Sequence, residues 1–499
     1  MPEHLGRRMI ARLKLRKSVA QVQLEAQTSE LTRSLGPANL VFLGIGCIIG
    51  AGIFVRTGNA AALHAGPAVL ISFLIAGIVC GLTGLCYAEL SSTLPVSGSA
   101  YTYCYTTIGE FAAWLMGSLL LLEYGLAASV ISVGWSGYVV SLLNDFGIHI
   151  PVELAGPMGH VAPDGTVQVF NLPAFGLCAG MAFLLFLGVS KSAKFNNVIV
   201  SIKLTVLIAF ILVVGWHIAQ NFDTLKHNWT PFIPEPTGRY GEFGWSGVLR
   251  GASIVFFAYV GFEAVSTAGQ EAKNPERDMP IGIIGSLVAC TIIYILISIV
   301  LTLMVNYTHL NTPDPIAVAV DALGPKWRWF SMLVKSGAII GLTSVVLILM
   351  YGQTRVFYTM ARDGLLPRIF SFVHPRFKSP SVNTVVVGLI VSISAGFAEI
   401  NTMGDMTSVG TLTAFAIVCS TVIWLRRTHP ELTRGFSVPF YPVLPVLGIL
   451  ACLFLIMTVE VHVLKMLSLY LVGSTVVYFL YGFRHSALAR ERGLSGDER

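Results

Sequence analysis

Charged residues are scarce in this chain of 499 residues: Asp, Glu, Lys and Arg make up 12% of it, whereas soluble proteins carry about 25%. Hydrophobic residues reach 54%, and the mean hydropathy is +0.73. Too few charges are present to cover a water-exposed surface for a chain of this size. The composition therefore excludes a soluble enzyme, a disordered protein and a nucleic-acid binder.

Cysteine and metal-binding patterns are also missing. The eight cysteines form no Cys-x-x-Cys pair, and each lies in or beside an apolar run. We expect them to be reduced and buried as small hydrophobic residues. No spacing of His, Cys and Asp suggests a metal, and no nucleophile–base pair is apparent in the polar segments of the chain. We therefore expect no enzymatic activity and no cofactor.

Long apolar runs dominate what is present, and a run of about 20 residues can cross a bilayer. Twelve such runs are centred near residues 48, 79, 126, 180, 206, 258, 293, 343, 390, 415, 450 and 475. Ten or eleven spans remain an alternative, because the runs near 180 and 206 nearly merge. With the N-terminus in the cytoplasm, 23 of the 32 Lys and Arg residues fall on the inner side. This asymmetry predicts a multi-pass protein of the cell membrane (plasma or bacterial inner) with both termini cytoplasmic.

The first span carries four glycines in nine residues, at positions 44, 46, 50 and 52. Each costs about 0.8–1 kcal/mol relative to Ala in a helix interior and permits backbone angles that other residues avoid. One explanation is a small-residue face for close helix packing. These glycines point in several directions, however, so an unwound segment is the better interpretation.

The sixth span has a second irregularity at residues 256–266, where Gly261 and Glu263 interrupt an aromatic, apolar run. Irregular backbone at membrane depth is tolerated only against protein or a water-filled cavity. Two broken spans five helices apart predict an inverted-repeat transporter with its site at the midplane. Free N–H groups at one half-helix end bind a carboxylate, and free carbonyls at the other accept from an ammonium. This pair of dipoles favours an α-amino acid as substrate.

Five segments carry a resemblance to a known family: GIGCIIGAGIF (44–54), YAELSSTLPVSGSAYTY (87–103), LLLEYGLAASVISVGWSGY (120–138), FFAYVGFEAVSTAGQEAKNPERDMPIGI (256–283) and GQTRVFYTMARDGLLP (352–367). They resemble the amino acid–polyamine–organocation superfamily, most closely the cationic amino acid transporters and their bacterial proton-coupled relatives. The resemblance implies an all-α integral membrane protein of the LeuT-like fold, with about 12 transmembrane helices. In that fold two five-helix repeats are inverted, two further helices follow, and spans 1 and 6 are unwound.

The implied organisation divides the chain into five parts: a basic cytoplasmic segment (1–37), a first repeat (38–218), a second, inverted repeat (245–427), spans 11 and 12 (438–484) and a cytoplasmic tail (485–499). The resemblance also implies the substrate contacts. Backbone N–H groups meet the substrate carboxylate at Ile48, Gly50, Ala51 and Gly52. Carbonyls meet its amino group at Phe257, Ala258 and Val260, and Phe257 closes over the substrate.

Lys203 lies nine residues beyond Lys194 at the inner edge, which is about 14 Å of helix. From that depth its ammonium cannot easily reach the interface, and burial disfavours the charged form. The resemblance places Lys203 beside Ile49 and Gly50 of the first span and Thr343 and Ser344 of the eighth. We therefore expect Lys203 to couple transport to a proton. Lys335, by contrast, is close enough to the interface to snorkel.

Glu123 and Glu263 are mid-span carboxylates, which by default indicate function. We expect them to line the substrate pocket, either relaying protons or receiving the cationic end of a basic substrate; a structural hydrogen bond is the alternative. Two nearby acids favour sharing one proton, so they do not decide the charge of the substrate.

The sequence thus predicts a secondary active transporter that carries an α-amino acid with a proton. An ion-independent exchanger of amino acids or polyamines is the closest alternative, and a sensor or channel on the same scaffold is an alternative of another class. The expected partners are the amino acid, the proton, membrane lipid and a small membrane accessory subunit, with no nucleic acid.

Overall fold

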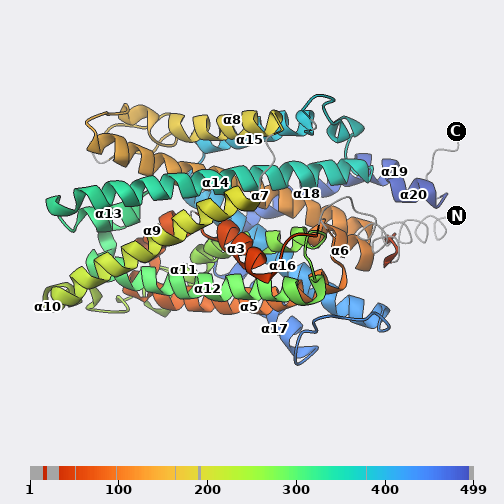
Figure 1. Cartoon of the computed structure of the whole chain (residues 1–499), viewed down its shortest axis with the longest axis horizontal. Coiled ribbons are helices and arrows are strands. Elements are labelled where there is room, and N and C mark those ends of the chain that lie inside the picture. The colour runs from red at the N-terminus through yellow and green to blue at the C-terminus, as the bar shows by residue number, and fades with distance from the viewer. Residues whose placement is uncertain are drawn as a thin grey trace.

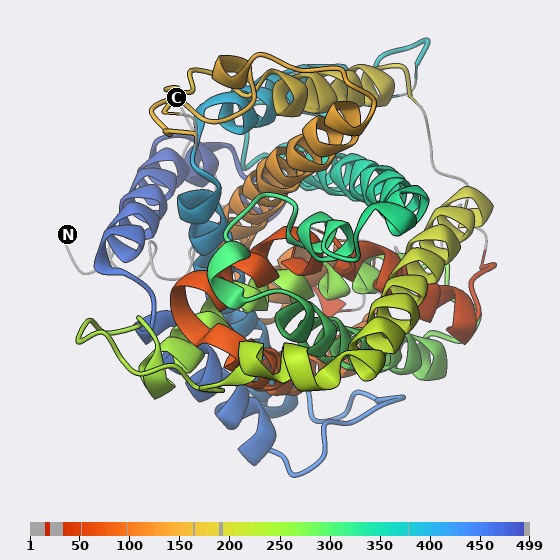
Figure 2. The ribbon, with the colours of Figure 1, turned by 90° about the vertical axis from the view of Figure 1, so that its left-hand side faces the viewer.

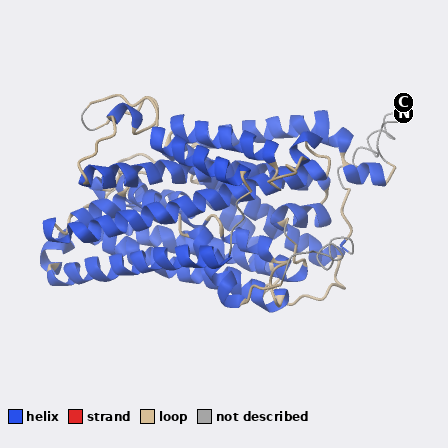
Figure 3. Cartoon of the chain, turned by 45° about the horizontal axis from the view of Figure 1, so that its top comes forward, coloured by secondary structure: helices blue, strands red, loops and turns tan. Residues whose placement is uncertain are grey.

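Helices make up the fold, and the described residues contain no strand (Figure 3). The structure is a computed structural model that describes residues 15–19, 33–50, 52–96, 98–162, 165–188, 193–377 and 379–493. Eight helical segments are long and apolar enough to cross a membrane: Gly52–Thr93, Glu110–Asp145, Asn197–Gln220, Gly244–Ala268, Pro275–Met304, Pro325–Arg362, Ile400–Thr428 and Val461–Glu491. Shorter apolar helices are Pro37–Ile48, Leu172–Phe186, Ser381–Phe397 and Val443–Met457.

The helices that carry the argument, in chain order, are α3 (Pro37–Ile48), α5 (Val69–Thr93), α6 (Ser99–Thr107), α7 (Glu110–Asp145), α8 (Leu172–Phe186), α9 (Ala193–Gln220), α11 (Gly244–Val255), α12 (Pro275–Met304), α14 (Arg328–Arg362), α15 (Ser381–Phe397), α16 (Ile400–Thr428), α17 (Val443–Met457) and α18 (Val461–Val477). Short helices α10 (Phe222–Leu225), α13 (Pro315–Asp321) and α20 (Ala487–Glu491) lie in connections or the tail. The separation of α8 from α9 favours two helices where the apolar runs nearly merged.

The described chain ends meet at one end of the helix bundle. Arg492 donates to the carbonyl oxygen of Arg16 (2.7 Å), and α20 lies opposite α10 and α13 along the long axis (Figure 1). We call the end with α20 the terminal end and the end with α10 and α13 the distal end. Figure 2 looks along the bundle from the distal end.

Both predicted helix breaks are present. The first helix, α3, stops at Ile48, Ile49 has an extended backbone, and the chain continues as a π-helical turn η1 (Gly52–Arg56). At the second break, α11 continues into the 3-10 segment η6 (Phe256–Tyr259), and another 3-10 segment, η7 (Phe262–Ala268), follows. Between them Gly261 adopts a φ of 115°, a conformation that side-chain-bearing residues rarely adopt.

Candidate functional site

The two broken spans touch each other. A Cβ atom on Gly52 would lie 2.0 Å from the Cα of Ala258, and one on Gly261 would lie 2.8 Å from the carbonyl oxygen of Cys47. Only residues without side chains allow the two backbones to approach so closely. The glycines predicted to unwind the spans therefore also bring them into contact.

A tyrosine from a neighbouring helix joins the two breaks. The hydroxyl of Tyr294, on α12, lies 3.0 Å from the carbonyl oxygen of Ile48 and 2.8 Å from that of Ala258, so its proton is directed at carbonyls of both breaks. Both accepting carbonyls stand next to the points where helical hydrogen bonding stops, so they have acceptor capacity that the helix does not use.

A small enclosed pocket lies where the breaks meet α7 and α14. Its free volume is about 10 Å³, room for about one water molecule, so it must widen to hold an amino acid. Its lining side chains are apolar or absent apart from one thiol: Cys47, Ile48, Gly50, Gly52, Ala127, Ile131, Phe257, Val260, Val345 and Leu349. We call it the central pocket.

Most of the predicted substrate contacts gather there. Five of them line the central pocket: Ile48, Gly50, Gly52, Phe257 and Val260. Ala258 packs against Gly52, and Ala51 lies outside the described residues.

Backbone N–H groups of the first break lie beside the pocket. Gly52 opens η1, and the N–H groups of a helix's first turn have no partner within the helix. Gly50 lies between α3 and η1, outside either helix. Ile49 is different, because its N–H donates to the carbonyl oxygen of Ile45 (2.9 Å) and so continues α3. Gly50 and Gly52 therefore each place a backbone N–H group that is not part of α3 at the pocket.

Lys203 reaches the first break, as expected. Its side chain is 1% exposed, and its ammonium donates to the carbonyl oxygens of Gly46 (3.0 Å) and Ile49 (3.1 Å). The stem packs against Gly341 of α14, where a Cβ atom would lie 2.8 Å from the Lys203 Cγ. Among the described residues, no carboxylate forms an ion pair with Lys203. Within the described part of the chain, the ammonium is therefore stabilised by hydrogen bonds to two carbonyl oxygens and by no ion pair.

Two residues proposed to accompany Lys203 bond to their own helix. The hydroxyl of Thr343 donates to the carbonyl oxygen of Ile339, and that of Ser344 to that of Gly341, each at 2.8 Å. Helix α14 thus supplies the surface against which the lysine stem packs, and Ile49 supplies an accepting oxygen.

Glu123 and Glu263 meet each other beside the central pocket and do not line it. They are 0% and 1% exposed. Glu263 accepts from the N–H of Gly261 (2.9 Å), and the hydroxyl of Thr411 on α16 lies against Glu123. Because Glu123 lies one helical turn before the pocket-lining Ala127, the pair is a turn away from the pocket.

Comparison with known proteins finds relatives over most of the chain. A family model described as "Amino acid permease" matches residues 35–481. The methylthioribose transporter and the branched-chain amino acid permease BcaP, both of Bacillus subtilis (strain 168), are each 42% identical and cover 95% of this chain and 98% of their own length. The vacuolar cationic amino acid transporter 4 of Arabidopsis thaliana is 37% identical over 83% of this chain and 67% of its own.

The chain belongs to the amino acid permease family. Its relatives carry the names of transporters and not of enzymes. The chain is therefore a multi-pass membrane protein of amino acid transport, in agreement with the resemblance seen in the sequence.

The permease is closed on the distal side of the central pocket by a clasp of three charged residues. Arg56, at the end of η1, donates to Asp405 of α16 (2.5 Å), and Arg250 of α11 donates to the other oxygen of the same carboxylate. The two arginines are 1% and 4% exposed. One carboxylate on α16 thus holds the distal halves of both broken spans. We call these three residues the distal clasp.

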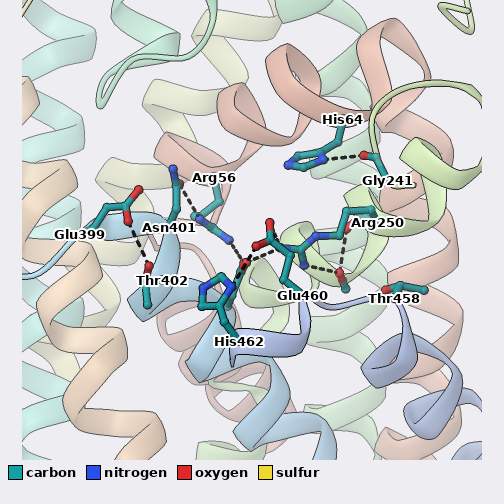
Figure 4. A network of polar contacts seen from close by, with 12 residues as sticks. Arg56, His64, Gly241, Arg250, Glu399, Asn401, Thr402, Thr458, Glu460 and His462 are labelled. Carbon is teal, nitrogen blue, oxygen red and sulfur yellow. Dashed lines mark hydrogen bonds and ion pairs between the residues drawn. The ribbon is translucent and has the colours of Figure 1, made fainter. Parts of the chain in front are cut away.

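A cavity of about 530 Å³ adjoins the distal clasp. Figure 4 shows Arg56 and Arg250 pointing toward each other, with Glu460 and His462 from the start of α18 beside them. Arg56 also donates to Asn401 (3.0 Å), and Glu460 lies 4.0 Å from Arg250. The polar groups that line the cavity give the distal side of the permease a hydrophilic approach to the clasp.

The terminal side of the permease is also closed. Lys17 forms an ion pair with Asp363, which follows α14, and the hydroxyl of Tyr101 on α6 donates to the same carboxylate, both at 2.8 Å. Arg426 of α16 pairs with Glu89 of α5 (2.5 Å). Ion pairs therefore tie helices together on both sides of the central pocket.

One prediction was wrong: Lys335 does not snorkel. Its side chain is 1% exposed, and the ammonium pairs with Asp145 (2.7 Å) and Asp321 (3.0 Å). The carboxylates at the end of α7 and in α13 stabilise the charge within the protein, so Lys335 need not reach lipid headgroups.

Sequence reasoning missed Tyr294 and the distal clasp. Tyr294 was detectable as a polar tip inside the apolar run 284–305. Arg56, directly after the glycine-rich break, and Asp405, inside the run centred near 415, were both detectable as charges in or at apolar spans. Their pairing follows only from the tertiary packing of η1 and α11 on α16.

Proposed function

We propose that this permease carries an α-amino acid together with a proton by alternating access. The observation that carries the proposal is the Lys203 ammonium on the carbonyl oxygens of Gly46 and Ile49. Charge-assisted hydrogen bonds are about twice as strong as neutral ones, so a protonated Lys203 braces the first break. Loss of the proton weakens both bonds and frees the break to move.

Matching helix lengths support the inverted repeat that alternating access requires. Helices five spans apart have similar lengths: α3 and α11 have 12 residues each, α5 and α12 have 25 and 30, α7 and α14 have 36 and 35, α8 and α15 have 15 and 17, and α9 and α16 have 28 and 29. Packing follows the same order, since α5 contacts α12, α7 contacts α14 and α8 contacts α15. Two similar units facing each other would produce this pattern.

We infer that both repeats, with α17 and α18, form twelve spans, and that the terminal end faces the cytoplasm. The excess of Lys and Arg on that side supports this orientation. The bundle of spans 1, 2, 6 and 7 would then rock against the remaining helices around the central pocket.

The lining of the central pocket supports a neutral, apolar substrate side chain. Ala127, Ile131, Val345 and Leu349 surround the backbone donors, whereas Glu123 and Glu263 face each other. An apolar wall selects by size and burial, and it offers no carboxylate to a cationic side chain. The relative named a branched-chain amino acid permease is consistent with this selection.

Uptake into proteoliposomes tests the proposal. Labelled leucine, valine, alanine, lysine and methylthioribose are supplied with a pH gradient or a sodium gradient, imposed separately. With one proton per substrate, one pH unit sustains about tenfold accumulation. We expect leucine or valine to accumulate under the pH gradient alone. Counterflow without any gradient-driven accumulation would instead identify an exchanger, and a steady ionic current would identify a channel.

A further inference from the structure

The Glu123–Glu263 pair cannot be explained as two ordinary carboxylates. Three of its four oxygens, both of Glu123 and Oε1 of Glu263, have no hydrogen-bond donor among the described residues. No lysine or arginine in the described part of the chain forms an ion pair with either acid. Two adjacent negative charges in this interior would repel each other strongly and leave buried acceptors unpaired.

One proton resolves both difficulties. A protonated carboxyl group gains an O–H donor, so one acid can donate to the other, and a single charge remains. The N–H of Gly261 already donates to Glu263 Oε2. The Thr411 hydroxyl is 0% exposed and has no other partner among the described residues; it lies against Glu123 and can donate to it.

The described surroundings of the pair come from several helices, and no Lys, Arg or His among the described residues acts on either acid. Tyr87 of α5 and Tyr124 of α7 interact electrostatically with both acids, and Cys80 of α5 interacts with Glu263. None of these groups carries a positive charge that would stabilise a second carboxylate. The proton is therefore the group that completes the site.

The pair joins two elements that alternating access must separate. Glu123 is on α7, whereas Glu263 is on η7, the terminal half of the second broken span. We propose that Glu123 and Glu263 form a one-proton site that latches η7 to α7, and that loss of this proton favours opening of the central pocket toward the terminal end. This latch rests on the alternating access proposed above and is separate from Lys203.

Accessibility of Cys47 provides the test, because its thiol lines the central pocket and is 4% exposed. A water-soluble methanethiosulfonate reagent is added to the purified full-length protein across about pH 5 to 9, a range that spans ordinary carboxyl, His and thiol values. A Cys47→Ser variant identifies the part of the labelling that belongs to Cys47. The matched control is Glu123→Gln/Glu263→Gln, whose two amides keep a hydrogen bond without a titrating proton.

The readout is the ratio of the wild-type labelling rate to that of the double variant. Ionisation of the thiol and of Lys203 affects both proteins and cancels. We expect the ratio to rise at least about tenfold with pH, the change expected when a latch site loses its proton over one pH unit. A ratio that stays constant would overturn the proposal, because the pair would then be a purely structural contact.

Two additional variants keep the test decisive if the double variant does not fold. Glu123→Gln alone leaves one acid that no longer needs to share a proton, so its pH-dependent rise should be lost. Thr411→Val removes a hydroxyl that stabilises the charged form, so the rise should move to higher pH. A wild-type profile in both would again contradict the latch. If Lys203→Ala still accumulates substrate, the proposed coupling fails while this ratio remains interpretable.

Discussion

At the scale of single residues, the site depends on positions where a side chain is missing. Gly52 and Gly261 let the two breaks meet. The breaks themselves were predictable, because the four glycines of the first span point in several directions and Gly261 interrupts the sixth. The depth of Lys203 in its span likewise predicted its burial. The partner atoms of Lys203 were expected only through the resemblance, because they depend on how α9 crosses α3.

Replacing Gly52 by Ala tests the contact between the breaks. The new Cβ would lie 2.0 Å from the Ala258 Cα, a backbone atom that cannot move aside easily. We expect uptake to fall at least about tenfold and stability to fall by about 1–3 kcal/mol, as for other overpacked sites. Uptake in proteoliposomes and thermal unfolding in detergent measure the two effects.

Gly81 supplies the matched control, because a Cβ atom there has no neighbour within 4 Å. Gly81→Ala, inside α5, should keep uptake and gain about 0.5–1 kcal/mol of stability. Wild-type uptake by Gly52→Ala would show that the close approach is not required.

At the scale of elements, the broken spans are held by charges on helices that are themselves continuous. Asp405 of α16 forms ion pairs with the distal halves of both broken spans. Lys203 of α9 hydrogen-bonds to the terminal half of the first broken span. The sequence indicated where the helices break, because glycine and aromatic residues interrupt apolar runs locally. The sequence did not indicate which continuous helices contact the broken spans, because those contacts join residues more than 150 positions apart.

Replacing Asp405 by Asn should open the distal clasp. Two buried guanidinium groups would lose their shared carboxylate, and removing one partner of a buried pair costs about 3–5 kcal/mol. We expect Cys47 to react with the soluble thiol reagent at least about tenfold faster and the unfolding temperature to fall.

Glu399→Gln provides the comparison for this experiment. Glu399 lines the same cavity and accepts from Thr402 at an exposed position, and among the described residues it forms no ion pair with either clasp arginine. The Glu399→Gln variant should leave the labelling rate of Cys47 unchanged. Equal rates in Asp405→Asn and the wild type would mean that the clasp does not control access.

At the scale of the whole molecule, the two broken spans and helices α7 and α14 enclose the central pocket, and ion pairs tie the helices together on both sides of it. The number of apolar runs and the positions of the breaks were readable from composition and periodicity. The ion pairs on both sides of the pocket were not, because pairs such as Lys17–Asp363 and Arg56–Asp405 connect distant parts of the chain. Lys335 shows the same limit, since its burial depends on carboxylates in two other elements.

Proton-driven accumulation by a Lys203→Ala variant is the most direct test of proton coupling through Lys203. Wild type and variant are reconstituted at equal density and supplied with labelled leucine under a gradient of one pH unit, with counterflow measured in parallel. Coupling through Lys203 predicts that the wild type accumulates leucine about tenfold, whereas the variant equilibrates it without accumulation and keeps counterflow. Accumulation by Lys203→Ala equal to that of the wild type would contradict the proposed coupling.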